Sequence, residues 1–271
     1  MSESSRHDAW SAGNSYEAYM GRWSRQVAPR FLQWLAPAPG LAWLDVGCGT
    51  GALSAAIVAG CNPASVIGVD PSAAFVDLAR QQVPDPRAAF RVGDAQHLPL
   101  PDEDRDLVVS ALMLNFVPDK AQALREMRRV ARAGGTVAFY VWDYPGGGVE
   151  FMRAFWVAAI SLHPEAEGLA ENKRFPYCTP EGLNTLLASA GLNAAAIEAI
   201  EVPTVFASFE DYWRPFTLGA GPAPGYCMSL TESERQKLRD RLEASLPRAK
   251  DGSIPLRARA WAARTEAVAR R

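Results

Sequence analysis

Cysteine, histidine and net charge are all scarce in this chain of 271 residues. The 4 cysteines are widely spaced and form no Cys-x-x-Cys pair, which argues against a disulfide framework or a zinc site and favours a reducing compartment. The 3 histidines, His7, His97 and His163, do not have metal-ligand spacing. We therefore expect no bound metal ion.

A dominant charge and long apolar runs are also missing. The chain has 28 basic and 30 acidic side chains, so its net charge of -2 creates no general attraction to nucleic acid or to an anionic membrane. No apolar run approaches the roughly 18 residues of a membrane span, and Met1 to His7 lack a signal-peptide pattern. We expect a cytoplasmic monomer or homodimer that acts on a small molecule, with no nucleic-acid or membrane partner.

From residue 41 the sequence alternates short apolar runs with amphipathic ones, which is typical of a parallel sheet between two layers of helices. The runs apolar enough to be covered on both faces, and so predicted as the first strands, are 41–46, 66–69, 88–92, 107–111 and 136–142. Two later strands are predicted at 195–206 and 254–263. The expected fold is an α/β doubly wound, seven-stranded, mostly parallel sheet.

Helices are predicted between these strands. They lie near 51–59, 72–83 and 119–131, from Thr179 to Ala190, and in an N-terminal segment over 14–36. In the third, Leu124, Met127 and Val130 form a buried stripe, and the arginines at 125, 128 and 129 take the other side. Gly134-Gly135 is predicted to end that helix and turn the chain into the next strand.

The segment Asp45-Val46-Gly47-Cys48-Gly49-Thr50-Gly51 is the most informative motif of the chain. Because glycine has no Cβ, a loop of alternating glycines lets a ligand lie against the main chain at the end of a strand. Cys48 is expected to be a small buried residue rather than a nucleophile. The motif predicts a pocket of nucleotide size.

Two further acids, Asp70 and Asp94, stand where the next two strands end. The carboxyl ends of adjacent parallel strands open on one crevice, so these acids and Asp45 can face one ligand. Asp70 is placed for ribose hydroxyls, and Asp94 for an adenine amino group. The spacing G-x-G-x-G differs from the dinucleotide fingerprint G-x-G-x-x-G. This difference favours a nucleoside with an amino-acid tail as the ligand.

These motifs resemble those of the class I S-adenosylmethionine-dependent methyltransferases, and most of all the type 11 group that includes the ubiquinone and menaquinone biosynthesis enzymes. The stretches 45–51, 68–72 and 93–100 are similar to the first three family motifs, and 129–135 is similar to the turn before the fifth strand. The resemblance covers residues 14–143 and implies a Rossmann-like fold. Ala131 and Ala133 depart from it, because the family often has leucine and proline there.

The resemblance implies S-adenosylmethionine as the cofactor and assigns residues to its parts. Asp45, Gly47 and Gly49 would line the methionine end, Asp70 would hold the ribose, Asp94 and Ala95 would hold the adenine, and Leu112 would close the pocket. Cys48, Gly51 and Pro71 belong to the same motifs and are included in the predicted cofactor site.

Two residues of the N-terminal segment are further cofactor candidates. Tyr16 could close over the methionine moiety, and Arg22 could pair with its carboxylate. Docking of an amphipathic helix onto the sheet would explain these side chains equally well.

Methyl transfer by in-line displacement needs alignment and desolvation more than proton transfer, so we identify no catalytic base from the sequence. Asn115 is a candidate substrate contact, with capping of the helix near Asp119 as the alternative. Residues 144–178 and 207–250 are rich in aromatics and are predicted as helical insertions that form a substrate lid on a single domain of residues 1–271. Within the lid, Tyr144 and Trp213 are candidate substrate contacts, although most of the aromatics should be core.

The predicted function is transfer of a methyl group to a small, partly apolar acceptor. Three alternatives remain: an adenosyl-ligand binding protein without turnover, an NAD-dependent oxidoreductase, and an RNA methyltransferase. The last would use the basic C-terminus, but Arg257 and Arg259 alternate with apolar residues as the solvated face of a strand would.

Overall fold

The computed structural model describes residues 17–193, 196–219 and 221–266. The chain divides into two compact units, each built from separate stretches of sequence. We name them the sheet unit (Ser24–Val141, Tyr177–Ile200 and Ala260–Arg271) and the helical unit (Met1–Trp23, Trp142–Pro176 and Glu201–Arg259).

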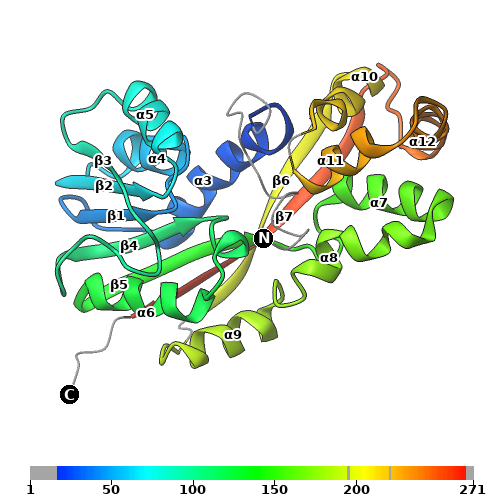
Figure 1. Cartoon of the computed structure of the whole chain (residues 1–271). Coiled ribbons are helices and arrows are strands. Elements are labelled where there is room, and N and C mark those ends of the chain that lie inside the picture. Colours follow the sequence, from blue (N-terminus) through cyan, green and yellow to red (C-terminus); the bar gives the residue numbers. More distant parts are fainter. Residues whose placement is uncertain (1–16, 194–195, 220, 267–271) are drawn as a thin grey trace. The chain divides into compact units, whose positions relative to one another are not determined.

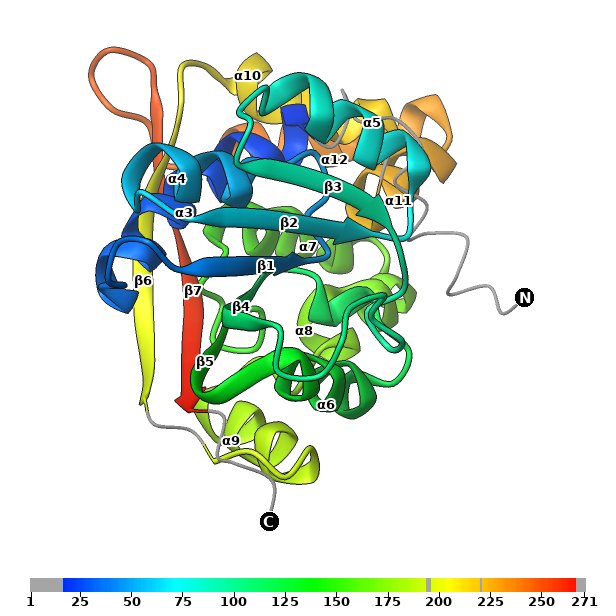
Figure 2. The same cartoon turned by 90° about the vertical axis from the view of Figure 1, so that its left-hand side faces the viewer.

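A seven-stranded sheet has the strand order β3-β2-β1-β4-β5-β7-β6 (Figure 1). Its strands are β1 (Ala42–Val46), β2 (Ser65–Asp70), β3 (Ala88–Val92), β4 (Arg105–Ala111), β5 (Ala131–Trp142), β6 (Ala196–Phe206) and β7 (Ile254–Glu266). The first five pair in parallel, whereas β6 and β7 run in opposite directions in Figure 2. The predicted doubly wound, mostly parallel sheet is confirmed. The strand order reverses between β1 and β4, which is where such sheets bind ligands.

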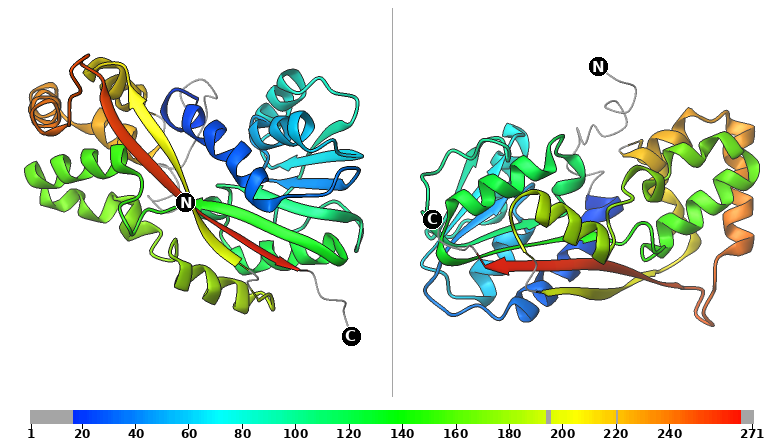
Figure 3. Two further views of the ribbon diagram at one scale, coloured as in Figure 1. Left: turned by 180° about the vertical axis from the view of Figure 1, so that it is seen from behind. Right: turned by 90° about the horizontal axis from the view of Figure 1, so that it is seen from below.

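Helices cover both faces of the parallel strands. In the sheet unit these are α4 (Ala52–Gly60), α5 (Ala73–Gln82), α6 (Lys120–Val130) and α9 (Pro180–Ser189), together with the short 3₁₀ turn η2 (Leu114–Phe116). The sheet unit also contains α3 (Arg22–Leu35) from its third residue onward. Figures 1 and 3 show α4 and α5 on one face and α6 and α9 on the other. This arrangement follows from right-handed crossovers that step outward in both directions from β1 and β4.

Helices α6 and α9 begin at residues whose side chains cap them. Asp119 caps α6 by accepting a hydrogen bond from the Gln122 N–H (2.8 Å), and Thr179 caps α9 by accepting one from the Gly182 N–H (3.0 Å). The predicted stripe of Leu124, Met127 and Val130 on α6 is completely buried.

Strand β3 does not match the prediction that every strand is covered on both faces. Phe90 is buried, but Val92 is 54% exposed. The reason is its position, because β3 is an edge strand with a neighbour on one side only.

Two predicted boundaries also shift. Helix α6 ends at Val130, and β5 begins at Ala131, because Ala131 pairs with Arg105 before an irregularity in the register. The N-terminal segment begins as a π-helix, η1 (Glu17–Gly21), and continues as α3, so its predicted start at residue 14 lies outside the described residues.

The helical unit contains α7 (Glu150–Leu162), η3 (Pro164–Leu169), α8 (Glu171–Arg174), α10 (Phe209–Trp213), η4 (Arg214–Leu218), α11 (Pro222–Ser229) and α12 (Glu232–Ser245). Aromatic side chains make much of its core, and the rings of Phe155 and Phe216 stack 4.4 Å apart. The carboxylate of Asp143, almost fully buried, pairs with the Arg259 guanidinium at 2.7 Å. Arg259 is therefore half-buried in an ion pair, whereas Arg257 is exposed as predicted.

Within the part of the chain that the structure describes, no helix combines the length and hydrophobicity needed to cross a membrane. All four cysteines are described, and none forms a disulfide bond.

Candidate active site

The glycine loop leaves the carboxyl end of β1 in a conformation that side chains disfavour. Gly47, Gly49 and Gly51 have φ angles of 71°, 52° and 89°, in the left-handed region where glycine avoids strain. The N–H groups of Gly47 and Cys48 both donate to the Val69 carbonyl, at 2.7 and 3.1 Å. The loop is thereby fixed to the end of β2.

Two of these glycines have different surroundings. A Cβ placed on Gly47 would collide with the side chain of Met113, so the loop packs directly against the turn that follows β4. A Cβ on Gly49 would meet no atom of the described chain within 4 Å. The main chain at Gly49 therefore borders open space beside Asp70.

Asp70 connects the glycine loop to the start of α5. Its carboxylate accepts hydrogen bonds from the Gly49 N–H and the Ser72 N–H, both at 2.9 Å, and the residue is only 7% exposed. Burial raises the pKa of this carboxyl, and the two N–H donors oppose that rise. Each oxygen retains a lone pair that a ribose hydroxyl could use.

Asp45 is a completely buried carboxyl at the end of β1. Its Oδ2 accepts a hydrogen bond from the Ser54 hydroxyl (2.7 Å), and its Oδ1 has no partner among the described residues. Burial raises the pKa of Asp45 to about 7; the hydrogen bond from Ser54 lowers it and the nearby Asp70 charge adds to the rise. An unpaired carboxylate oxygen in this position would be stabilised by a cation.

Cys48 packs as a small apolar residue. It belongs to a buried cluster with Val76, Ala79, Val83 and Phe90, and burial raises the pKa of its thiol. The missing side chain of Gly68 makes room for it, since a Cβ there would lie 3.0 Å from the Cys48 sulfur. This agrees with the expected packing role and not with a nucleophile.

The loop after β3 carries Asp94, whose side chain is 52% exposed, and Ala95, which is buried. Asp94 Oδ1 accepts a hydrogen bond from the Gln96 N–H (2.9 Å), and His97 Nδ1 lies 3.7 Å from Asp94 Oδ2. His97 is an exposed loop residue, as expected.

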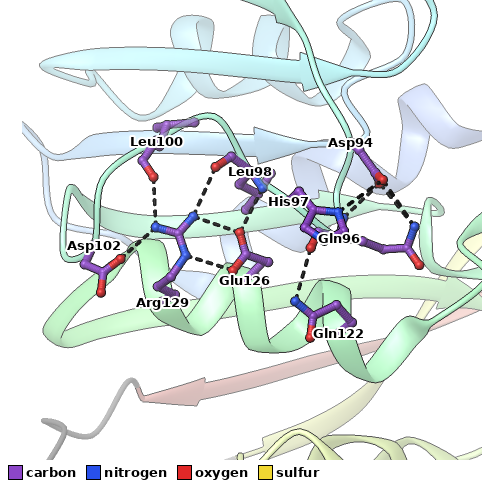
Figure 4. A network of polar contacts seen from close by, with 9 residues as sticks. All are labelled: Asp94, Gln96, His97, Leu98, Leu100, Asp102, Gln122, Glu126 and Arg129. Carbon is purple, nitrogen blue, oxygen red and sulfur yellow. Dashed lines mark hydrogen bonds and ion pairs between the residues drawn. The ribbon is translucent and has the colours of Figure 1, made fainter.

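Helix α6 holds this loop along its length (Figure 4). Glu126 accepts a hydrogen bond from the Leu98 N–H (2.8 Å), and Arg129 donates to the carbonyls of Leu98 (3.1 Å) and Leu100 (2.9 Å). Arg129 also pairs with Asp102 and Glu126, both at 2.8 Å. Nearer the start of α6, Gln122 donates to the Gln96 carbonyl (3.2 Å).

Sequence reasoning misses this network, because it places Arg129 on the outer face of the helix. The local signal is an acid and an arginine three residues apart, Glu126 and Arg129, which orient each other. Their partners in the loop lie about thirty residues away in sequence, and no periodic pattern predicts those contacts.

The turn after β4 carries two more predicted residues. Leu112 is buried with a φ of 62°, and its N–H donates to the Tyr140 carbonyl (2.9 Å). Asn115, in η2, is also buried, and its Oδ1 accepts hydrogen bonds from the hydroxyl of Tyr177 and the thiol of Cys178. The alternative that Asn115 caps the next helix is wrong, because Asp119 itself provides that cap.

Of the two N-terminal candidates, Tyr16 lies outside the described residues. Arg22 belongs to the helical unit, where its guanidinium pairs with Asp211 (2.8 Å) and lies 4.3 Å and 4.6 Å from the ring centres of Trp23 and Phe206. These contacts support a packing role for Arg22, and its predicted contact with a cofactor stays a prediction.

The candidate substrate residues Tyr144 and Trp213 also lie in the helical unit. Tyr144 is half-buried, with its ring 5.5 Å from that of Phe175. Trp213 is buried and stacks on Phe209 at 6.4 Å. Among the described residues, no group of three or more His, Cys, Asp or Glu side chains is arranged to hold a metal ion.

The strand order, the glycine loop after β1 and the acids after β2 and β3 together define a class I methyltransferase fold. Residues 44–139 match the family described as methyltransferase domain. Residues 44–139 therefore form a methyltransferase domain of this family.

Two curated relatives carry methyltransferase names. The chain is 33% identical over 157 residues to a demethylmenaquinone methyltransferase of Roseiflexus sp., an alignment that covers 55% of this chain and 66% of that protein. It is 44% identical over 96 residues to the enzyme of that name from Lactiplantibacillus plantarum, covering 34% of this chain and 40% of the other. The matches thus span two thirds or less of these relatives.

The structural likenesses extend further along the chain. The structure of a candidate methyltransferase from Bacillus halodurans superposes with a TM-score of 0.61 at 16% identity, covering 90% of this chain and 100% of the other. A geranyl diphosphate methyltransferase in complex with S-adenosylmethionine gives a TM-score of 0.53 at 17% identity, covering 96% and 93%. At these identities the likeness concerns the fold alone.

Proposed function

We propose that the chain is an S-adenosylmethionine-dependent methyltransferase that acts on a small, partly apolar acceptor. The observation that carries this proposal is the set of Asp45, Gly49 and Asp70 at the carboxyl ends of β1 and β2, next to the point where the strand order reverses. A buried acid with an unpaired oxygen, a main chain that borders open space and a second acid held by two N–H groups lie there together. This set suits a ligand with a ribose and a positive charge.

The residues present fit that cofactor. Asp70 would bind the ribose hydroxyls, Asp94 and Ala95 the adenine, and Asp45, Gly47 and Gly49 the methionine end, with Leu112 against the base. Cys48, Gly51 and Pro71 would support the same loops. The cofactor would supply a methyl group already activated on a sulfonium, so the chain need not polarise a leaving group.

The chain itself must hold the reacting atoms in position and keep water away from them. The glycine loop is fixed to β2 through the Val69 carbonyl, and the loop after β3 is fixed to α6 through Glu126 and Arg129. Fixed loops hold the reacting atoms in line, which accounts for much of the acceleration of a displacement. A general base is required only if the accepting atom carries a proton.

We further propose that aromatic side chains of the two predicted insertions contact the acceptor. These side chains, Tyr144 and Trp213 among them, would supply apolar contact area. We also propose a cytoplasmic monomer or homodimer without a nucleic-acid partner.

Production of S-adenosylhomocysteine tests the activity. The purified chain is incubated with S-adenosylmethionine and a panel of small phenols, enols, amines and carboxylic acids, with Asp70→Asn as the control. Acceptor-dependent product from the wild type, lost in the variant, supports the proposal. Tight binding of S-adenosylmethionine without product from any acceptor supports the alternative of a binding protein.

A further inference from the structure

The side chain of Asn115 has one satisfied end and one unsatisfied end. It is 7% exposed, its Oδ1 accepts hydrogen bonds from Tyr177 and Cys178, and its Nδ2 has no hydrogen-bond partner among the described residues. Leaving a buried amide donor unpaired is destabilising. Such a donor is unusual in a native core and calls for an acceptor that the chain itself does not provide.

The position of this amide places it at the candidate active site. Asn115 is three residues beyond Leu112, on the turn that follows β4 at the carboxyl end of the parallel strands. The same turn packs on the glycine loop, because the Met113 side chain fills the space where a Cβ of Gly47 would stand. All of these residues belong to the sheet unit.

Two neighbours orient the amide. The hydroxyl of Tyr177 and the thiol of Cys178 both donate to Oδ1, so the amide presents its N–H₂ group on the other side. Tyr177 and Cys178 come from the segment just before α9, sixty-two and sixty-three residues along the chain. That separation explains why the sequence did not pair them with Asn115.

A positive charge lies beside Tyr177. The Lys120 ammonium donates to the Val117 carbonyl at 3.0 Å and is 5.4 Å from the centre of the Tyr177 ring. Partial burial lowers its pKa, and the nearby Cys178 and Asp119 oppose that shift. The Asp119 carboxylate is engaged by the Gln122 N–H, at the cap of α6.

We propose that the Asn115 amide, which Tyr177 and Cys178 orient, binds an anionic oxygen of the methyl acceptor. The acceptor class is then an apolar molecule that carries a phenolate, enolate or carboxylate oxygen. Asn115 is the contact residue and Tyr177 is a positioning residue. This inference rests on the proposed function, since it treats the carboxyl end of the sheet as the reaction site.

The test compares anionic probes with neutral probes of the same shape. Benzoate, 2-naphthoate and 4-nitrophenolate are titrated against toluene, 2-methylnaphthalene and nitrobenzene, with saturating S-adenosylhomocysteine present. The wild type should bind at least one anion about tenfold tighter than its neutral partner, because hydrogen bonds to charged groups are worth more than that factor. Absence of any such preference would overturn the inference.

Four variants assign the preference to its residues. Asn115→Leu should abolish it, Asn115→Asp should reverse it by repelling the anion, and Tyr177→Phe should reduce it while keeping the ring. Asn184→Leu, at an exposed position of α9, is the matched control and should preserve it. A preference that survives in both Asn115 variants contradicts the inference.

Binding of S-adenosylhomocysteine separates this inference from the proposed function. All four variants should keep wild-type affinity for it, whereas loss of that affinity in the Asn115 variants would indicate a structural role for the amide and contradict the inference. If the wild type fails to bind S-adenosylhomocysteine, the proposed function fails, and the probe titrations without it still test the oxygen site.

Discussion

At the scale of single residues, Asp45 makes the clearest electrostatic prediction. Burial raises its pKa from the ordinary aspartate value of 3.8 to about 7, so between these values the folded state holds a proton that the unfolded state has released. The free energy of unfolding should therefore fall as the pH rises from about 4 to about 7, by at most about 4 kcal/mol from this group.

Asp45→Asn isolates that contribution, because an amide resembles the protonated acid and can keep the hydrogen bond from Ser54. The variant should gain stability relative to the wild type as the pH rises through this range, with no further gain above about pH 7. Urea unfolding at pH 5, 6, 7 and 8 measures the difference. Parallel curves for the two proteins would show that Asp45 keeps its ordinary pKa.

A steric prediction can be made for Gly49, and Gly40 provides the matched control. Gly49 and Gly40 both have a positive φ, and a Cβ on either meets no described atom within 4 Å. Alanine at either position should therefore cost about 1 kcal/mol of stability through backbone strain. Only Gly49→Ala should also weaken binding of S-adenosylmethionine, by at least about tenfold, because its Cβ would enter the space for the ligand.

Calorimetry and thermal unfolding of the two glycine variants check this pair. Equal loss of stability with unequal loss of binding is the expected result. Equal binding by Gly49→Ala and Gly40→Ala would mean that the ligand does not lie against the loop.

At the scale of elements, helix α6 acts as the support of the loop after β3. Arg129→Met removes the donors to the carbonyls of Leu98 and Leu100, so that loop should become more mobile. We expect faster amide hydrogen exchange over residues 95–101 and several-fold weaker binding of S-adenosylmethionine. Arg125→Met is the control on the same helix, since Arg125 is exposed and bonds to Gln122 on its own helix.

If the two arginine variants show the same amide exchange and the same affinity, Arg129 does not support the loop, and α6 contributes only its apolar stripe to the fold.

That apolar stripe was predictable from the sequence, because Leu124, Met127 and Val130 recur with helical spacing. The same applies to the strands, whose apolar runs are local. The contacts of Arg129 and Asn115 were not predictable, because their partners are distant in sequence and are brought together only by the sheet.

The predicted site shows the same division between local and distant information. The positions of the glycine loop and of Asp45, Asp70 and Asp94 at the ends of strands were predictable, because each lies beside an apolar run in its own sequence window. Tyr177 and Lys120 were missed because a tyrosine before a helix and a lysine at its first turn have no distinctive pattern. The ion pair between Arg22 and Asp211 was not predictable either, because the two residues are 189 positions apart.

At the scale of the whole molecule, we propose that Trp213, in the helical unit, contacts the acceptor and not the cofactor. Trp213→Ala should then weaken turnover of the true acceptor and leave the affinity for S-adenosylmethionine nearly unchanged. Trp213→Phe, which keeps a ring against Phe209, should recover part of the turnover. Loss of turnover and cofactor affinity together in Trp213→Ala would indicate a packing role.

Binding of the cofactor is the most direct test of the central claim. The purified chain and its Asp70→Ala variant are titrated by calorimetry with S-adenosylmethionine, S-adenosylhomocysteine and NADH. We predict that the wild type binds both adenosyl ligands and not NADH, and that the variant binds neither. Binding of NADH alone would contradict the account and assign the glycine loop to an oxidoreductase.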